Sequence, residues 1–186
     1  MLYLIGGASR TGKTLMAKQL SSQMGIPYLS LDWIMMGFTN GIPEYGVHDK
    51  LFPDDIAKRL WPFYKAMFES MIAVDTTCII EGEALLPGLL TQFVQEYPKE
   101  LKVCFMGYVN VDLVKKVEEI RRYSNARNDW LADKSDDYLI DHIHNMMVHS
   151  QHIQQSCLEH RMQYFDTAEN FPKTIASTIR YLLAQP

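Results

Sequence analysis

The chain has 186 residues, 47% of which are hydrophobic, and its formal net charge at pH 7 is −4. The negative charge opposes bulk attraction to a nucleic acid polymer, and no apolar run approaches the roughly 20 residues that a membrane span requires. The composition therefore predicts a soluble chain with one domain, residues 1–186, that binds neither nucleic acid nor membrane.

The N-terminal residues and the cysteines indicate the compartment. Met1–Ile5 leads directly into glycines and lacks the basic region and apolar stretch of a signal peptide, so we expect a cytoplasmic protein. Cys78, Cys104 and Cys157 are odd in number and far apart, which favours neither a disulfide framework nor a zinc site.

Five short apolar runs alternate along the chain with longer segments of helical period. The runs predict strands at Leu2–Ile5, Pro27–Leu31, Thr77–Glu81, Lys102–Gly107 and Met162–Asp166. The other segments predict helices at Lys13–Met24, Asp54–Ala73, Pro87–Glu96, Val111–Tyr123, Ser135–His160 and Asn170–Ala184. The strands are nearly continuous in hydrophobic residues, as in a parallel sheet with helices on both faces, so we expect an α/β fold.

Two segments fit neither pattern. Asp32–Pro53 contains three glycines and a proline before its last residue, and Tyr123–Lys134 is polar. Loops of this length in a compact domain are usually functional or mobile, and we expect the same of these two segments.

The clearest motif is an eight-residue match to G-x-x-x-x-G-K-[ST] between the first predicted strand and the first predicted helix. Its residues are Gly7, Ala8, Ser9, Arg10, Thr11, Gly12, Lys13 and Thr14. In this context the motif predicts a loop whose backbone N–H groups surround the phosphates of ATP.

Each fixed position of the motif has a chemical reason. Gly7 and Gly12 allow backbone angles and a close approach that a side chain would prevent. Lys13 supplies a mobile positive charge to the β- and γ-phosphates, and Thr14 offers a hydroxyl to Mg²⁺. Arg10 could contact the nucleotide or simply face solvent.

A phosphate loop also needs a carboxylate at the end of a neighbouring strand, to fix Mg²⁺ directly or through water. We assign Glu81 to the metal and Asp32 to the acceptor, as a general base or a group that orients a hydroxyl. Asp32 could instead cap a helix that begins at Trp33, and Glu81 could be a solvated charge. Glu83 could assist either carboxylate, but a solvated charge is the favoured interpretation.

Phosphoryl transfer benefits from cations that close over the transferring group, often from a lid. Arg121, Arg122 and Arg127 are the candidates, and we assign Arg122 and Arg127 to catalysis. The alternative is that arginines at a helix C-terminus oppose its dipole and face solvent.

We interpret the histidines of one predicted helix and the aromatic residues before it mainly as packing residues. His142, His144, His149 and His152 share one predicted helix without the spacing of an H-E-x-x-H metal site. The segment from Trp33 to Tyr64 is rich in aromatic side chains, which suit core packing but also permit stacking on a ring or base.

The order of these parts resembles the P-loop kinases of the nucleoside monophosphate kinase and shikimate kinase group, across essentially the whole chain. The resemblance implies a three-layer α/β/α fold with a five-stranded parallel sheet, and ATP with Mg²⁺ as cofactors. It further implies an acceptor-binding region at about residues 32–73, a lid at about residues 122–134, and an adenine near Asp166–Asn170. The D-G-[FY]-P-R segment of adenylate kinases and the Gly-Gly-Gly of shikimate kinases are absent, so neither family's acceptor is transferred.

We therefore expect an ATP-dependent kinase that acts on a small molecule or nucleotide, as a monomer or homodimer. The alternative is a P-loop NTPase or nucleotide-dependent switch that acts with a macromolecular partner. The chain lacks an N-K-x-D motif, and no D-x-x-G motif stands beside a predicted strand, which disfavours a guanine-reading switch.

Overall fold

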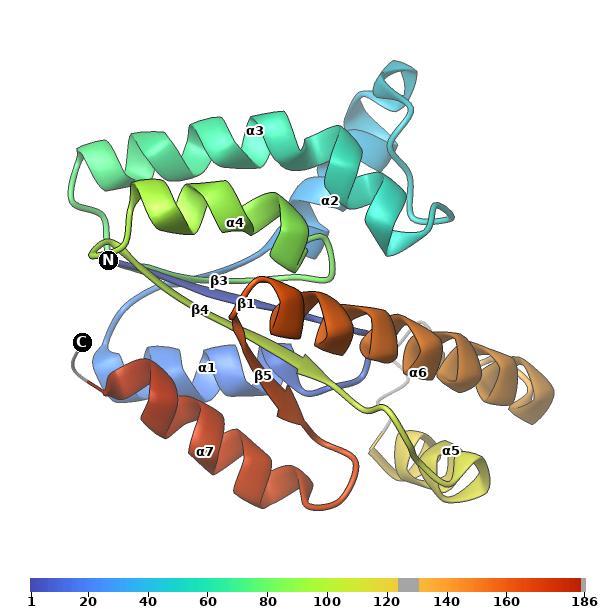
Figure 1. Cartoon of the computed structure of the whole chain (residues 1–186). Coiled ribbons are helices and arrows are strands. Elements are labelled where there is room, and N and C mark those ends of the chain that lie inside the picture. Colours follow the sequence, from blue (N-terminus) through green and yellow to red (C-terminus); the bar gives the residue numbers. More distant parts are fainter. Residues whose placement is uncertain (124–130, 185–186) are drawn as a thin grey trace.

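The computed structural model describes residues 1–123 and 131–184. In this part of the chain, five parallel strands form one sheet with the order β2-β3-β1-β4-β5 (Figure 1). Their bounds are β1 Leu2–Gly7, β2 Tyr28–Ser30, β3 Cys78–Glu81, β4 Leu101–Gly107 and β5 Gln163–Asp166. In the register of the sheet, Leu4 of the central strand pairs with Ile80 on one side and Val103 on the other.

Helices cover both faces of the sheet (Figure 1). Their bounds are α1 Lys13–Met24, α2 Leu31–Gly41, α3 Pro53–Ala73, α4 Pro87–Glu96, α5 Leu113–Tyr123, α6 Asp136–Glu159 and α7 Phe171–Leu183, with a short 3-10 turn at Pro43–Tyr45. Helices α1 and α7 lie on one face, and α3, α4 and α6 lie on the other.

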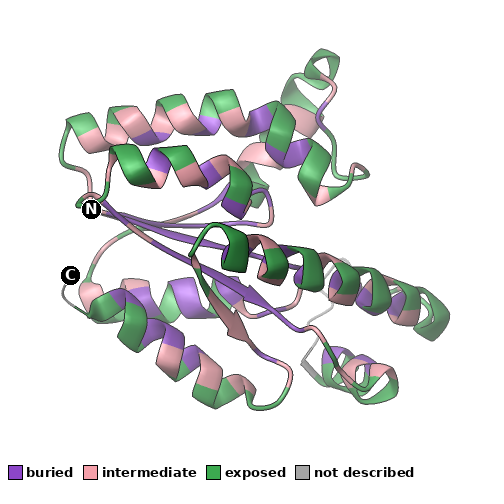
Figure 2. Cartoon of the chain, in the orientation of Figure 1, coloured by how far each residue is buried: buried purple, intermediate pink, exposed green. Residues whose placement is uncertain are grey.

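Alternate residues of the strands point into two separate hydrophobic layers. Leu4 and Ile80 pack with Phe68 of α3 on one face, while Ile5 and Met106 pack with the helices on the opposite face. Because both faces are covered, the central strands are buried along their length, as the colours of Figure 2 show. The predicted three-layer α/β/α architecture is confirmed.

A third hydrophobic cluster joins α5 and α6 to the loop after β1. Ala8 and Tyr108 pack there with Val117 of α5 and with Leu139 and Ile143 of α6. The start of α6 is capped by Ser135, whose hydroxyl accepts a hydrogen bond from the Tyr138 N–H, and acidic residues occupy its first turn as expected.

Helix α2 is the main departure from the predicted elements, because Leu31 was expected to end a strand and Asp32–Pro53 to form a loop. Leu31, Ile34, Met35 and Phe38 recur at helical spacing and pack against the core beneath α3. Gly37 lies in this helix, where a Cβ would meet only open space. The glycines were interpreted as loop residues, but burial of the apolar face outweighs their low helix propensity.

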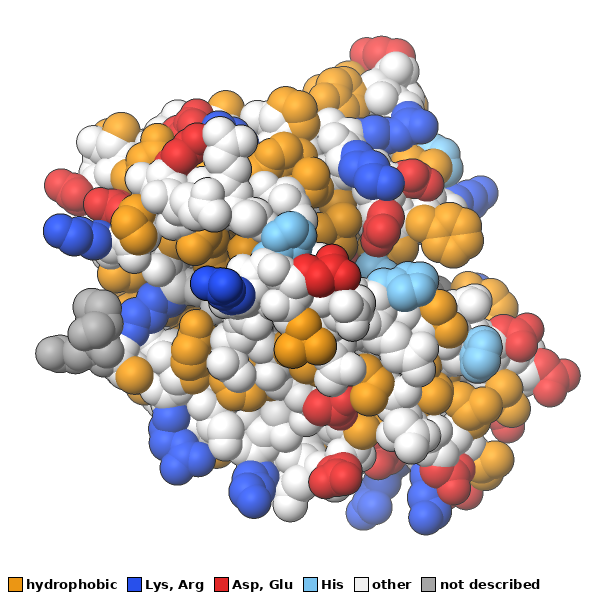
Figure 3. Space-filling view, in the orientation of Figure 1, with side chains coloured by type: hydrophobic (Ala, Val, Ile, Leu, Met, Phe, Trp, Pro, Cys, Tyr) orange, Lys and Arg blue, Asp and Glu red, His pale blue; other side chains and the backbone are white. Residues whose placement is uncertain are grey.

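Within the described residues, no helix combines the length and the apolar character needed to cross a membrane. On the face seen in Figure 3, acidic and basic side chains are interspersed and do not form a broad basic surface.

Candidate active site

The phosphate loop lies between β1 and α1, at the carboxyl ends of the strands. Gly7 has φ 133°, and a Cβ at this position would collide with the carbonyl oxygen of Met106 in β4. Gly12 has φ 88°, and a Cβ there would approach the Phe171 ring at 2.6 Å. Both positions therefore require glycine, for the conformation and for the close approach.

Lys13 and Thr11 both donate hydrogen bonds to the carbonyl oxygen of Ala8. The distance is 2.6 Å from Lys13 Nζ and 2.9 Å from the Thr11 hydroxyl. Lys13 is only 7% exposed, so its ammonium group is held inside the curve of the loop. A phosphate oxygen bound in the loop would be a stronger, charged acceptor for this donor than the carbonyl is.

Thr14 and Glu81 form the pair that could hold Mg²⁺. The Thr14 hydroxyl donates to Glu81 Oε1 at 3.1 Å, and Glu81 ends β3 with 1% of its surface exposed. The alternative of a solvated charge at Glu81 is therefore wrong. Among the described residues, no group of three or more His, Cys, Asp or Glu side chains could hold a metal ion. Mg²⁺ keeps most of its bound waters, so one hydroxyl and one carboxylate from the protein are enough to hold it.

Asp32 lies in the first turn of α2, next to the end of β2. The helix begins at Leu31 with Ser30 as its N-cap residue, so the alternative that Asp32 caps a helix starting at Trp33 is wrong. The Asp32 side chain is exposed at the carboxyl edge of the sheet. Burial is the main cause of the raised pKa values of Tyr64 and Glu83, and the negative charge of Asp32 adds to both.

The environment of Glu83 differs from the solvated one that the sequence favoured. Burial is the main cause of its raised pKa, and the charges of Asp32 and Glu81 act in the same direction. Lys13 and a hydrogen bond from Ser9 oppose this effect. Glu83 is thus a half-buried carboxyl group in the turn after β3, and it is not a fully solvated surface charge. The Glu-Gly-Glu sequence directly after a strand was the available signal.

The negative charges of Asp32 and Glu83 also act on two buried tyrosines. Tyr64 of α3 and Tyr108, directly after β4, are fully buried, and neither hydroxyl has a hydrogen-bond partner among the described residues. Burial raises the pKa of both, and the charge of Asp32 adds to the effect at Tyr64 and that of Glu83 at Tyr108. Tyr64 was interpreted as a packing residue, and Tyr108 was not singled out.

His149 of α6 faces Asp54 at the start of α3, with 3.6 Å between Nδ1 and Oδ1. Burial is the main cause of the lowered pKa of His149; Asp54 raises it, while Lys13 and His152 lower it further. The pair therefore connects the two helices close to the phosphate loop. These residues lie far apart in sequence, and only the fold brings them together.

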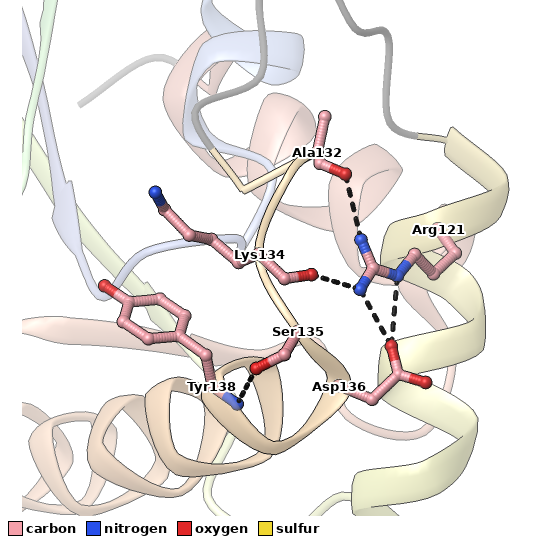
Figure 4. A network of polar contacts seen from close by, with 6 residues as sticks. All are labelled: Arg121, Ala132, Lys134, Ser135, Asp136 and Tyr138. Atoms are coloured by element: carbon pink, nitrogen blue, oxygen red, sulfur yellow. Dashed lines mark hydrogen bonds and ion pairs between the residues drawn. The ribbon is translucent and has the colours of Figure 1, made fainter.

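The three arginines considered for the lid differ in what the structure shows of them. Arg121 donates to Asp136 from Nε at 3.2 Å and from a terminal nitrogen at 2.8 Å, and it also donates to the carbonyls of Ala132 and Lys134 (Figure 4). It therefore ties the end of α5 to the start of α6. Arg122 is the exposed neighbour on α5, and Arg127 lies outside the described residues.

The segment expected near the adenine follows β5 and is fixed by local hydrogen bonds. Asp166 accepts from the backbone N–H groups of Ala168 at 2.7 Å and Val109 at 3.3 Å. The Thr167 hydroxyl donates to the Gly107 carbonyl at 3.0 Å. These contacts hold the ends of β4 and β5 beside each other at the same edge of the sheet as the phosphate loop.

Several solved structures with a similar fold carry the names of kinases. A shikimate kinase from Bacteroides thetaiotaomicron has a TM-score of 0.56 and 18% identity, with 98% of each chain covered. A sugar kinase from Janibacter has a TM-score of 0.54 and 15% identity, with 97% of this chain and 93% of that chain covered. A shikimate kinase from Acinetobacter baumannii in complex with shikimate has a TM-score of 0.52 and 11% identity, with 98% and 92% covered.

No model of a protein family matches the chain, and a search of curated proteins finds no match either. At these identities the structural likeness concerns the fold alone. The predicted resemblance to P-loop kinases of the shikimate kinase group is confirmed at that level.

Proposed function

We propose that the chain transfers the γ-phosphoryl group of ATP to a small molecule. The observation that carries this proposal is the pairing of a complete phosphate loop with the Thr14–Glu81 contact, beside the carboxylates of Asp32 and Glu83. The loop and the pair suit nucleotide phosphates and Mg²⁺, whereas the other two carboxylates are available to a second substrate.

The residues divide into a donor side and an acceptor side. On the donor side, the loop N–H groups and Lys13 would bind the phosphates, and Thr14 and Glu81 would hold Mg²⁺, which neutralises developing negative charge when bound. On the acceptor side, Asp32 would orient the attacking hydroxyl and receive its proton. The acceptor-binding region at about residues 32–73 contains Asp32, Asp54 and Tyr64.

The lid at about residues 122–134 is part of the same proposal. Arg122 and Arg127 would close over the transferring phosphoryl group and offset its charge. Arg121 is excluded from this role because its guanidinium group is already bonded to Asp136 and to two backbone carbonyls.

Two variants test the division of roles. Lys13→Ala should abolish transfer and weaken ATP binding, because it removes the charge that contacts the β- and γ-phosphates. Asp32→Asn should lower kcat by about 100-fold or more while ATP affinity stays within about twofold of wild type, because a general base acts only on the acceptor. ATP affinity is measured by calorimetry and turnover by ADP release.

Variants of matched size serve as controls. Lys18→Ala, on the exposed side of α1, should leave both quantities unchanged. Equal losses of ATP affinity in Lys13→Ala and Asp32→Asn would show that the acceptor role of Asp32 is wrong.

A further inference from the structure

A cavity of about 310 Å³ opens at the end of the sheet that lies opposite the phosphate loop. We call it the amino-edge cavity, because Leu101 at the start of β4 is part of its lining. The strand runs from there to Gly107, beside the phosphate loop, so about 20 Å of strand separates the cavity from the candidate active site. The rest of the lining comes from α4, from the turn that leads into β5 and from the end of α7.

The amino-edge cavity exists because β4 begins earlier than its neighbour β5. The pairing of the two strands starts at Cys104 and Gln163, so the first three residues of β4 extend beyond β5 in the described sheet. On the α7 side, the Tyr181 hydroxyl donates to the Val103 carbonyl at 3.3 Å and fixes the wall there. Most of the lining is apolar, as in sites that take up the body of a small organic molecule.

The charged residues that line the cavity in the described part of the chain are both cations, Lys102 and Arg161. Arg161 is exposed and Lys102 is half-buried, so a ligand can reach both. The acidic residues that are near them in sequence bond to other groups. Glu100 accepts from the backbone N–H of the preceding residue at 3.2 Å, and Glu159 accepts from the Gln155 amide at 3.0 Å. The charge of the cavity therefore favours an anion.

The backbone at Arg161 supports the same interpretation. Its φ is 56°, and its N–H donates to the Leu158 carbonyl at 3.3 Å, while the Met162 N–H donates to the Cys157 carbonyl at 2.8 Å. These two bonds form a common helix end in which glycine usually occupies the position with positive φ. A residue with a side chain costs stability there, and such a cost is often found at sites with a function. In this chain the position carries a guanidinium group into the lining of the cavity.

We propose that the amino-edge cavity binds a small carboxylate with a compact apolar body. The carboxylate receives charge-assisted hydrogen bonds from Lys102 and Arg161, and the apolar body packs against Leu101 and Met162. A volume of about 310 Å³ is at the lower end of the range for small-molecule sites, which limits the body to a compact group such as one ring. The site is separate from the proposed phosphoryl transfer and does not depend on it.

A matched pair of probes tests the class of ligand. The full chain, labelled with ¹⁵N, is titrated with 3-phenylpropanoate and with the uncharged 3-phenylpropanamide, and backbone amide signals are followed by NMR. We expect the carboxylate to bind with a Kd at least about tenfold lower than that of the amide, because only the carboxylate forms charge-assisted hydrogen bonds. The signals of Leu101–Val103 and Met162 should shift, and those of Gly7–Thr14 should not. Equal affinities, no binding, or shifts confined to the phosphate loop would overturn the proposal.

Two variants test the cations. Lys102→Gln and Arg161→Gly should each raise the Kd of 3-phenylpropanoate by about tenfold and leave that of the amide unchanged. Arg161→Gly should also raise the Tm, because glycine suits a φ of 56°, so its loss of affinity cannot be attributed to unfolding. Lys99→Gln is the control, since Lys99 is exposed near the same end of the sheet but does not line the cavity. An unchanged Kd in both variants, or an equal increase in the control, would overturn the proposal.

Discussion

At the scale of single residues, the candidate site combines the contiguous phosphate loop with carboxylates from the segments that follow two strands. Gly7 to Thr14 are contiguous, and each residue type is fixed by local backbone geometry or direct phosphate chemistry. Glu81 and Asp32 could be located because Glu81 ends a predicted strand and Asp32 directly follows one. Tyr64 and Tyr108 are buried in segments more than forty residues apart, and only the fold shows that the charge of Asp32 acts on the first and that of Glu83 on the second.

Glu83 gives a prediction about stability and pH. Burial raises its pKa in the folded state, so the fold favours the protonated carboxyl, and Glu83 costs stability as the pH rises through that raised value. Glu83→Gln keeps the shape and removes the charge. The variant should therefore have a higher Tm than wild type at pH 8, and the difference should shrink as the pH falls toward 4.

The control for this experiment is Glu100→Gln, which changes a carboxyl group near the opposite end of the sheet. Thermal melts of the three proteins across pH 4 to 8 provide the measurement. A Tm difference between Glu83→Gln and wild type that does not depend on pH would contradict the raised pKa of this half-buried carboxyl group.

At the scale of elements, periodicity predicted the strands and most helices, whereas α2 was missed because its glycines were interpreted as loop residues. Residues 31–41 contain two glycines, which favour a loop when local propensity alone is considered. The segment is helical because its apolar residues, which recur at helical spacing, pack under α3, and this burial outweighs the low helix propensity of the two glycines. The missed helix matters for the site, since its first turn carries Asp32.

Two glycines should therefore respond in opposite ways to alanine. Gly12→Ala should destabilise the protein by about 1–3 kcal/mol, because its φ is 88° and its Cβ would meet the Phe171 ring. Gly37→Ala should stabilise it by about 0.5–1 kcal/mol, because the position is helical and open. Urea unfolding measures both, and a loss of stability in Gly37→Ala would argue against α2.

Substitutions of the two neighbouring arginines at the end of α5 should have different effects, one on stability and the other on activity. Arg121→Ala removes bonds to Asp136 and two carbonyls, and should cost about 1 kcal/mol because these contacts are largely solvent-exposed. Arg122→Ala should lower kcat, because we assign Arg122 to the lid. Thermal melts measure the effect of Arg121→Ala and ADP release that of Arg122→Ala, and an unchanged kcat in Arg122→Ala would show that the assignment is wrong.

At the scale of the whole molecule, the parallel sheet explains why the site forms where it does. All five strands of the described part run in the same direction, so their carboxyl ends bring Gly7, Ser30, Glu81 and Gly107 to one edge. Helices α3 and α6 approach this edge from one face and are joined by the pair of Asp54 and His149. The acceptor side is thus built from elements that surround the phosphate loop.

The fate of the γ-phosphoryl group tests the central claim most directly. The protein is incubated with ATP, Mg²⁺ and a panel of nucleotides and small hydroxyl compounds, and ³¹P NMR identifies the phosphorus product, with Lys13→Ala as the inactive control. Phosphoryl transfer to a small molecule predicts a new phosphate ester signal that grows in step with ADP. Release of inorganic phosphate alone, at a rate that no small acceptor changes, would contradict the kinase assignment and favour an NTPase.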